Sequence, residues 1–172
     1  MDITPLTHPP GDPLLAEVTT LYASNSEFFT LSGDFPDPDA ITPGQVAAAL
    51  AEEAAMDGAE GLLARDEAGR LVGVALTLAH HPDPADPDPW IGLLLVDVSR
   101  QRTGHGRELA ATIENRFRAD GRAAVRLAVL DNNPRGLAFW TALGYVEIAR
   151  RSDRQLGRPC RVLRKELPPQ HA

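Results

Sequence analysis

The stretch Gln101-Arg102-Thr103-Gly104-His105-Gly106 lies between an apolar run, Trp90–Val98, and an amphipathic segment that begins at Arg107. This order predicts a strand, a glycine turn and a helix. Such a turn directs several backbone N–H groups into one concavity at a helix N-terminus, where the helix dipole favours negative charge. The pattern indicates a site for a phosphate or pyrophosphate. Taken alone, glycines that only shape the turn explain it equally well.

Two helices are predicted near the N-terminus. The first begins at Asp12, with Pro13 at its first helical position, because apolar residues then recur at helical spacing. The second follows a capping box, in which Thr42 is the N-cap and Gln45 completes the box, and it runs to about Met56.

Strands are predicted between these helices and the glycine turn. Residues Gly61–Asp66 and Leu71–His80 flank the turn Glu67–Arg70 and form a hairpin. Residues Pro82–Pro89 hold four prolines and three aspartates, so we expect an exposed connector rather than a central strand. The run Trp90–Val98 is apolar with little alternation, as in a strand covered on both faces.

Helices and strands alternate after the glycine turn. We expect a helix over Arg107–Asp120, a strand over Ala124–Leu130, a helix from the Asn133 cap to about Leu143, and strands over Tyr145–Arg150 and Cys160–Leu167. With a short strand near Ile3, this order predicts an α/β or α+β fold, in which a mixed sheet carries helices on both faces. We expect residues 1–167 to form one domain and residues 168–172 to form a loose tail.

Composition restricts the class of protein. The formal net charge of −7 over 172 residues argues against a protein that binds nucleic acid. No apolar run is long enough to span a membrane, and we expect no secretory signal. Cys160 is the only cysteine, which excludes an intrachain disulfide and fits a cytoplasmic protein. The histidines show no ligand spacing, so we expect no metal site.

A second motif follows the first. From Asn133 to Tyr145 the chain reads Asn-Pro-Arg-Gly-Leu-Ala-Phe-Trp-Thr-Ala-Leu-Gly-Tyr. Together the two stretches resemble the GNAT superfamily of N-acetyltransferases, whose motifs are Arg/Gln-x-x-Gly-x-Gly/Ala and Asn-x-x-Ala-x-x-hydrophobic-Tyr-x-x-Leu-Gly-Phe. The resemblance covers most of the chain and is strongest from Trp90 to Ala149. It implies a mostly antiparallel sheet of about six or seven strands, in which the strand at Trp90–Val98 splays from the strand at Ala124–Leu130.

The resemblance also implies that acetyl-CoA is the co-substrate. Backbone N–H groups of the glycine turn would bind its pyrophosphate, and the pantetheine arm would lie between the splayed strands. A bulge near Leu94–Val96 would free one N–H for the thioester carbonyl. The implied contacts are Leu94, Val96, Gln101, Arg102, Thr103, Gly104, His105, Gly106, Arg107, Asn133 and Trp140. Simpler roles stay open for some of these residues. The two arginines can be surface charges, Asn133 can be only a helix cap, and Trp140 can be part of the core.

The implied reaction is direct transfer of the acetyl group to a primary amine of a small molecule or peptide. We assign no catalytic residue. Trp140 stands where many family members have a tyrosine that is proposed to protonate the thiolate, and indole cannot deliver that proton. Glu27, His80 and His81 are candidate bases by residue type only, and deprotonation through water is the default.

The sequence gives less information about the acceptor than about the cofactor. Phe28, Phe29 and Trp90 are candidate acceptor-site residues, with core packing as the alternative. The acidic loops could attract a cationic amine, and solvated loop charge also explains them; they carry Asp34, Asp37, Asp39, Asp83, Asp86 and Asp88. No residue pattern indicates a homodimer, and we leave the oligomeric state open.

Two other functions compete with acetyl transfer. One is a sensor or scaffold of the same fold that binds acetyl-CoA or CoA without turnover. The other is a site for a different nucleotide, which the sequence disfavours. Asp120 lies too close to the glycines for a dinucleotide fold, and no Gly-Lys-Ser/Thr follows them.

Overall fold

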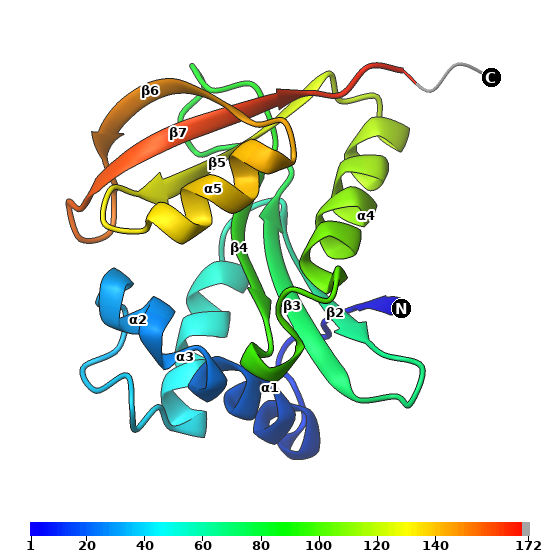
Figure 1. Ribbon diagram of the computed structural model, residues 1–172, viewed down its shortest axis with the longest axis vertical. Coiled ribbons are helices and arrows are strands. Elements are labelled where there is room, and N and C mark those ends of the chain that lie inside the picture. The colour runs from blue at the N-terminus through cyan, green and yellow to red at the C-terminus, as the bar shows by residue number, and fades with distance from the viewer. Residues whose placement is uncertain (170–172) are drawn as a thin grey trace.

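A seven-stranded sheet forms the centre of the computed structural model, which describes residues 1–169 (Figure 1). In spatial order its strands are β1 (Asp2–Pro5), β2 (Ala59–Arg65), β3 (Leu71–Leu78), β4 (Trp90–Val96), β5 (Ala124–Leu130), β7 (Pro159–Glu166) and β6 (Val146–Ser152). All neighbouring pairs are antiparallel except β4 and β5, which are parallel. The expected mixed, mostly antiparallel sheet is confirmed. Within the expected tail, residues 170–172 lie outside the described part of the chain.

The strands β4 and β5 separate almost where they begin. Only Trp90 and Arg126 pair across them, and the two strands then diverge toward their carboxyl ends (Figure 1). The splayed central strands implied by the family resemblance are confirmed. This opening, which we call the central gap, divides the sheet into the half β1–β4 and the half β5–β7.

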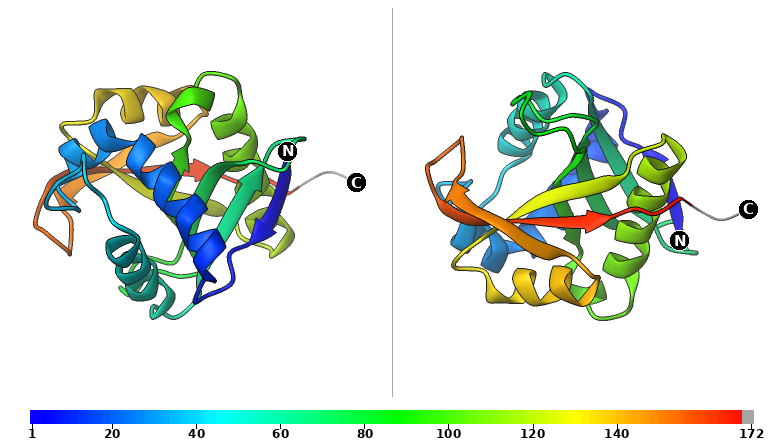
Figure 2. Two further views of the ribbon diagram at one scale, coloured as in Figure 1. Left: turned by 90° about the horizontal axis from the view of Figure 1, so that it is seen from below. Right: turned by 90° about the horizontal axis from the view of Figure 1, so that it is seen from above.

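Helices cover both faces of the sheet, as expected (Figure 2). One face carries α4 (His105–Ala119) and α5 (Pro134–Ala142), and the other carries α1 (Asp12–Ser24), α2 (Ser26–Ser32) and α3 (Pro43–Ala54). A separate apolar core lies on each face. Leu109, Ile113 and Trp140 belong to the first core, and Val18 and Val46 belong to the second.

The N-caps expected from the sequence are confirmed at α3 and α5, and the start of α1 differs by one residue. Helix α1 begins at Asp12 with proline in its first turn, although its N-cap is Gly11. Thr42 and Gln45 form the capping box of α3. The Asn133 side chain caps α5 by accepting a hydrogen bond from a backbone N–H in the first turn of that helix. The helix α2 was not expected, because its seven residues are too few for a periodic pattern.

The connector Pro82–Pro89 is not fully exposed, contrary to expectation. Asp86 and Asp88 are only 6% and 8% exposed. On the neighbouring strands, Arg126 and Arg164 stand directly opposite each other, which is unfavourable for two like charges. The Asp88 carboxylate lies between them and accepts a hydrogen bond from each Nε, at 2.7 and 2.9 Å. Burial of this connector thus follows from long-range ion pairing.

The bulge in β4 lies upstream of the predicted position. Leu93 pairs with Leu76 and Ile91 pairs with Thr77, so Gly92 is the extra residue. The segment Leu94–Val96, where we expected the bulge, pairs regularly with β3. Glycine fits a bulge because it has no side chain to pack in the disturbed ladder.

Candidate functional site

The glycine turn has an unusual backbone. Gly104 is the N-cap of α4 and has φ of 93°, in the left-handed region that glycine adopts without strain. Arg102 has φ of 61° and is the only residue other than glycine with positive φ in the described chain. For a residue with a Cβ this conformation costs about 1 kcal/mol. Strain of this kind is concentrated at functional sites.

Hydrogen-bond donors are left free at this turn. Within residues 1–169, the backbone N–H groups from Arg102 to Arg107 donate to no protein group. A Cβ placed on Gly104 would meet no atom within 4 Å, so the concavity is open. Neither the Arg102 nor the Arg107 side chain forms an ion pair or hydrogen bond in the described chain, whereas most other arginines do. Free amides and unpaired guanidinium groups together suit an anion with several oxygens.

Two residues of the turn also have a structural role that the sequence did not reveal. The Gln101 amide donates to Asn25 Oδ1 and to the Val96 carbonyl, at 3.1 and 3.2 Å, and so ties the turn to α1 and β4. A Cβ on Gly106 would lie 3.3 Å from the Phe139 ring. Gly106 therefore makes room for a protein side chain, whereas Gly104 leaves space open. Of the remaining members, Thr103 donates a hydrogen bond from its hydroxyl to the Arg100 carbonyl, and His105 is the first residue of α4.

A cavity of about 660 Å³ occupies the central gap and continues to α1, α2 and α3. The residues lining it include five of the predicted contacts, which are Leu94, Asn133, Trp140, Phe28 and Phe29. They come from β4, α5 and α2, three elements that are far apart in the sequence. The cavity thus brings residues that were predicted to contact the cofactor together with residues that were predicted to contact the acceptor.

Nine predicted contacts are not among the residues that line this cavity. Seven of them form the glycine turn, residues 101–107, and the other two are Trp90 and Val96. Trp90 sits at the closed end of the gap, where its ring packs against His81 and the Arg151 guanidinium lies 5.2 Å from its centroid. Val96 is buried, and its carbonyl accepts hydrogen bonds from Asn25 and Gln101. Their positions follow from the divergence of β4 and β5, which places only the middle of β4 against the cavity.

Glu53 was missed by the sequence analysis. It lines the cavity from α3, and a Cβ on Gly92 would lie 4.0 Å from its Oε2 atom, so its carboxylate faces the β4 bulge. No hydrogen bond or ion pair engages this carboxylate within the described residues. Burial, followed by the charges of Glu52 and Asp34, raises the pKa of Glu53 above its ordinary value. The raised pKa makes Glu53 a stronger base than an ordinary glutamate side chain.

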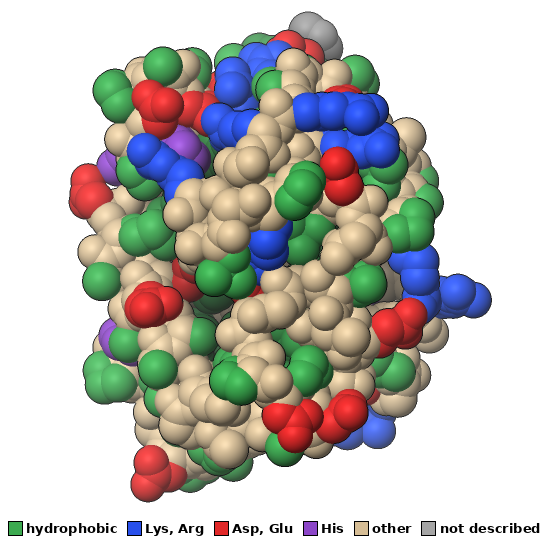
Figure 3. All heavy atoms as spheres, turned by 90° about the vertical axis from the view of Figure 1, so that its left-hand side faces the viewer, with side chains coloured by type: hydrophobic (Ala, Val, Ile, Leu, Met, Phe, Trp, Pro, Cys, Tyr) green, Lys and Arg blue, Asp and Glu red, His purple; other side chains and the backbone are tan. Residues whose placement is uncertain are grey.

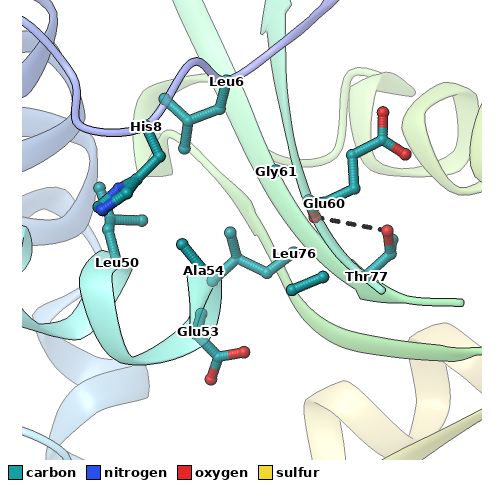
Figure 4. A pocket seen from close by; sticks show the side chains of 10 residues that line it. Leu6, His8, Leu50, Glu53, Ala54, Glu60, Gly61, Leu76 and Thr77 are labelled. Carbon is teal, nitrogen blue, oxygen red and sulfur yellow. Dashed lines mark hydrogen bonds between the residues drawn. The ribbon is translucent and has the colours of Figure 1, made fainter. Parts of the chain in front are cut away.

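A smaller cavity of about 150 Å³ lies on the other side of α3, between this helix and β2–β3. Leu6, His8 and Glu53 are among its lining residues. Figure 4 shows that the Glu53 carboxylate points away from Leu6 and His8. Because its Oε2 atom lies near Gly92, which lines the larger cavity, the Glu53 carboxylate faces that cavity.

Tyr22 is the second group that the sequence left unassigned. Its side chain is 2% exposed, packs between Phe29 and Phe35, and lines the larger cavity. Its hydroxyl forms no hydrogen bond within residues 1–169. Burial, followed by the charges of Glu53 and Asp34, raises the pKa of Tyr22, so the phenol stays protonated. By contrast, the Tyr145 hydroxyl donates to Glu114 in the core on the opposite face.

The three bases proposed by residue type lie outside the cavity lining. Glu27 pairs with Arg135 on the surface, at 3.3 Å. His80 pairs with Asp57 at 2.9 Å, and His81 packs against Trp90 at the closed end of the gap. Cys160 does line the cavity, but burial raises the pKa of its thiol, which keeps it protonated and unreactive.

Arg158 joins the two halves of the sheet at the cavity mouth. From the β6–β7 connection it donates to the Ser32 carbonyl at 2.5 Å and to Asp34 Oδ1 at 2.9 Å, both beyond the gap. Its Nε also donates to Asp153. Figure 3 shows the face on which α2 and the β6–β7 connection lie, with a hollow near its centre and Lys and Arg side chains gathered above it.

Comparison with known proteins agrees with this geometry. A model of the acetyltransferase (GNAT) family matches residues 20–145. Among solved structures, an acetyltransferase from Thermus thermophilus is 21% identical, with a TM-score of 0.72 over 96% of this chain and 96% of that one. An aminoglycoside 6'-N-acetyltransferase complexed with coenzyme A is 16% identical, with a TM-score of 0.67 over 100% of both chains. The ribosomal-protein-S18-alanine N-acetyltransferase from Escherichia coli is 16% identical, with a TM-score of 0.65 over 99% of this chain and 96% of that one.

These identities show a shared fold. Among curated proteins no match was found. Within residues 1–169 no helix has the length and apolar character needed to cross a membrane. The same residues contain no group of three or more histidine, cysteine or acidic side chains that could hold a metal ion.

Proposed function

This chain belongs to the GNAT acetyltransferase family, and we propose that it transfers the acetyl group of acetyl-CoA to a primary amine of a small molecule or peptide. One observation carries the proposal. A single cavity in the central gap is bounded by Asn133 and Trp140 on one side, and by an unpaired carboxylate, Glu53, on the other. Free backbone donors lie at the start of α4, which follows β4 in the chain.

The residues at the glycine turn fit the pyrophosphate of acetyl-CoA. Six successive N–H groups lack a partner in the described chain, and open space lies beside Gly104. Arg102 and Arg107 would add charge to the backbone donors. Asn133 and Trp140 would contact the pantetheine arm where it lies against α5.

The residues on the acceptor side fit an amine. An amine is protonated at neutral pH and must lose a proton before it attacks. Glu53 would take that proton, either directly or through one water, and the Tyr22 hydroxyl would donate a hydrogen bond to a group in the cavity. A nitrogen–carbon bond then forms and the carbon–sulfur bond breaks. The ammonium group loses two protons in all: the first passes through Glu53 to solvent, and the second moves from the attacking nitrogen to the departing thiolate, which leaves as the CoA thiol. Positioning of both substrates in one cavity supplies much of the rate enhancement.

A sensor that only binds CoA is supported less well. Such a protein has no use for an unpaired, partly buried carboxylate, which lowers stability. Trp140 in place of tyrosine still favours a sensor over an enzyme that needs a proton donor at that position.

The test combines ligand binding with turnover. We expect acetyl-CoA at 100 times its Kd to stabilise the protein by about 2.7 kcal/mol in a thermal shift assay, and we expect free thiol release with a panel of primary amines. Gly104→Glu should abolish binding through steric clash and charge. Gly69→Glu is the matched control, because Gly69 has φ of 77° with no atom within 4 Å of its Cβ position, and it lies in the β2–β3 turn. Equal affinity in both folded variants would refute the assignment of the glycine turn.

A further inference from the structure

The charges that line the acceptor side of the cavity do not balance. Four carboxylates line this region, from Asp34, Glu52, Glu53 and Asp153, and Arg158 is the only lysine or arginine among the lining residues. Arg158 is fully engaged, because it donates to both Asp34 and Asp153. Glu52 and Glu53 form no ion pair within residues 1–169. Two carboxylates thus face the cavity without a cation.

A second observation indicates that this region takes a ligand. Tyr22 is 2% exposed, lines the same cavity, and leaves its hydroxyl without a hydrogen-bond partner in the described chain. The Tyr22 oxygen is not among the fully buried side-chain atoms without a hydrogen-bond partner, so the hydroxyl opens into the cavity, where a ligand can pair with it. The aromatic rings of Phe28, Phe29 and Phe35 lie beside it and form an apolar wall.

We infer that the acceptor is a diamine, a molecule whose reacting amine lies near Glu53 and Tyr22 and whose second ammonium group pairs with Glu52 at the cavity mouth. This inference rests on the proposed function. Glu53 takes one proton from the reacting amine and becomes neutral, so it needs no further cation. Glu52 takes no part in the proton transfer, and it is the more exposed of the two carboxylates. The apolar wall would contact the methylene chain between the two nitrogens.

The inference excludes two other classes of acceptor. An amino acid would bring a carboxylate into a region that already has excess negative charge. A simple alkylamine would fill the apolar wall but leave Glu52 unpaired. The Arg158 guanidinium is not available to bind an anionic acceptor, because it already forms ion pairs with Asp34 and Asp153.

The test compares two acceptors of equal chain length, pentylamine and 1,5-diaminopentane, by thiol release with saturating acetyl-CoA. We expect kcat/KM to be at least about tenfold higher for the diamine, as for one hydrogen bond to a charged group. Because Glu52 also raises the pKa of Glu53, Glu52→Gln changes the base for both acceptors, and the loss that is specific to the diamine should be about tenfold in kcat/KM beyond any change for pentylamine. Glu67→Gln, an exposed carboxylate in the β2–β3 turn, is the matched control and should change neither value.

The outcomes separate this inference from the proposed function. Equal kcat/KM for the two acceptors, or an equal loss for both in Glu52→Gln, would overturn the diamine inference and leave amine acetylation intact. Absence of turnover with every amine, although acetyl-CoA binds, would overturn both.

Discussion

Gly136 lies in the first turn of α5, where a larger residue would collide with the cap of that helix. A Cβ at this position would lie 2.6 Å from Asn133 Nδ2, and the Gly136 N–H donates to Asn133 Oδ1 at 2.9 Å. The side chain that caps α5 also lines the cavity. The absence of a Cβ at Gly136 therefore fixes the position of a proposed cofactor contact.

We predict that Gly136→Ala separates stability from binding. Alanine gains about 1 kcal/mol of helix propensity, and the displaced cap loses about the same, so the free energy of unfolding should stay nearly constant. The affinity for CoA should fall several-fold, because Asn133 moves. Calorimetric titration and thermal unfolding check this.

Gly44→Ala provides the comparison. Gly44 occupies the first turn of α3, and its Cβ position is 4.0 Å from the nearest atom, Thr42 Oγ1. This variant should gain stability with unchanged CoA affinity. If Gly136→Ala also binds CoA normally, Asn133 is only a cap.

Glu53 gives a prediction with opposite effects on activity and stability. Glu53→Gln should lower kcat/KM by about 10²–10⁴, the usual contribution of a general base. Because burial, with Glu52 and Asp34, raises the pKa of Glu53, its ionised form is less stable in the folded protein than in the unfolded chain. The amide should therefore raise the melting temperature at pH 7.

The pH dependence distinguishes this role from simple packing. In the wild type, kcat/KM should fall as the pH drops through the raised pKa of Glu53, above the range of an ordinary carboxyl group. Glu53→Gln should lose this part of the profile. An unchanged pH profile in the variant would exclude Glu53 as the base.

At the scale of elements, the connector Pro82–Pro89 closes one end of the central gap. Asp88 bridges Arg126 of β5 and Arg164 of β7, and the Arg126 N–H donates to the Pro89 carbonyl at 2.9 Å. Burial opposes ionisation of Asp88, but the hydrogen bonds from the two arginines outweigh it and hold its pKa below the ordinary value. The connector thus stabilises the point from which β4 and β5 diverge.

We predict that Asp88→Asn destabilises the protein by about 1–3 kcal/mol at pH 7, as expected for loss of buried hydrogen bonds to charged groups. Since the folded-state pKa is lowered, this stabilisation is present above the ordinary carboxyl pKa and is lost as the pH falls toward the folded-state value. The difference in unfolding free energy between wild type and variant should therefore shrink in acid. Denaturant unfolding at several pH values measures it.

Asp39→Asn is a suitable control, because Asp39 is exposed in a loop. This substitution should leave the free energy of unfolding unchanged at every pH. A constant difference between Asp88→Asn and the wild type down to strong acid would show that the Asp88 charge contributes nothing.

At the scale of the whole molecule, the two halves of the sheet are joined at both ends of the gap. The connector joins them at the closed end. Across the open end, α2 receives hydrogen bonds from Asn132 to the Leu31 carbonyl at 2.9 Å and from Arg135 to Glu27 at 3.3 Å. Arg158 adds its contact with Asp34. These contacts hold the two halves of the sheet together around the cavity, where β4 and β5 do not pair with each other.

The sequence predicted the elements of this architecture better than its long-range contacts. Periodicity and caps are local, so α3, α5 and the glycine turn were located from their own residues. The burial of Asp88 depends on arginines that lie far along the chain, and the bulge at Gly92 depends on pairing with β3. No local pattern carries this information.

The candidate site likewise contains residues that a local pattern indicates and residues that only the fold brings together. The glycine turn and Asn133 belong to motifs, so the sequence alone could propose them as site residues. Glu53 belongs to none. It is one of several acidic residues on an amphipathic helix, and only the fold of α3 against β4 brings its carboxylate to the bulge. A family resemblance indicates a cofactor more readily than a base or an acceptor.

The central claim is that the free N–H groups from Arg102 to Arg107 bind the pyrophosphate of acetyl-CoA. A residue-resolved NMR titration of the ¹⁵N-labelled protein with CoA tests it most directly, with pantetheine as the ligand that lacks the pyrophosphate. We predict that CoA shifts these six amide resonances while that of Gly69 stays in place, and that pantetheine leaves all of them unchanged. Binding of CoA with no shift at residues 102–107 would contradict the claim.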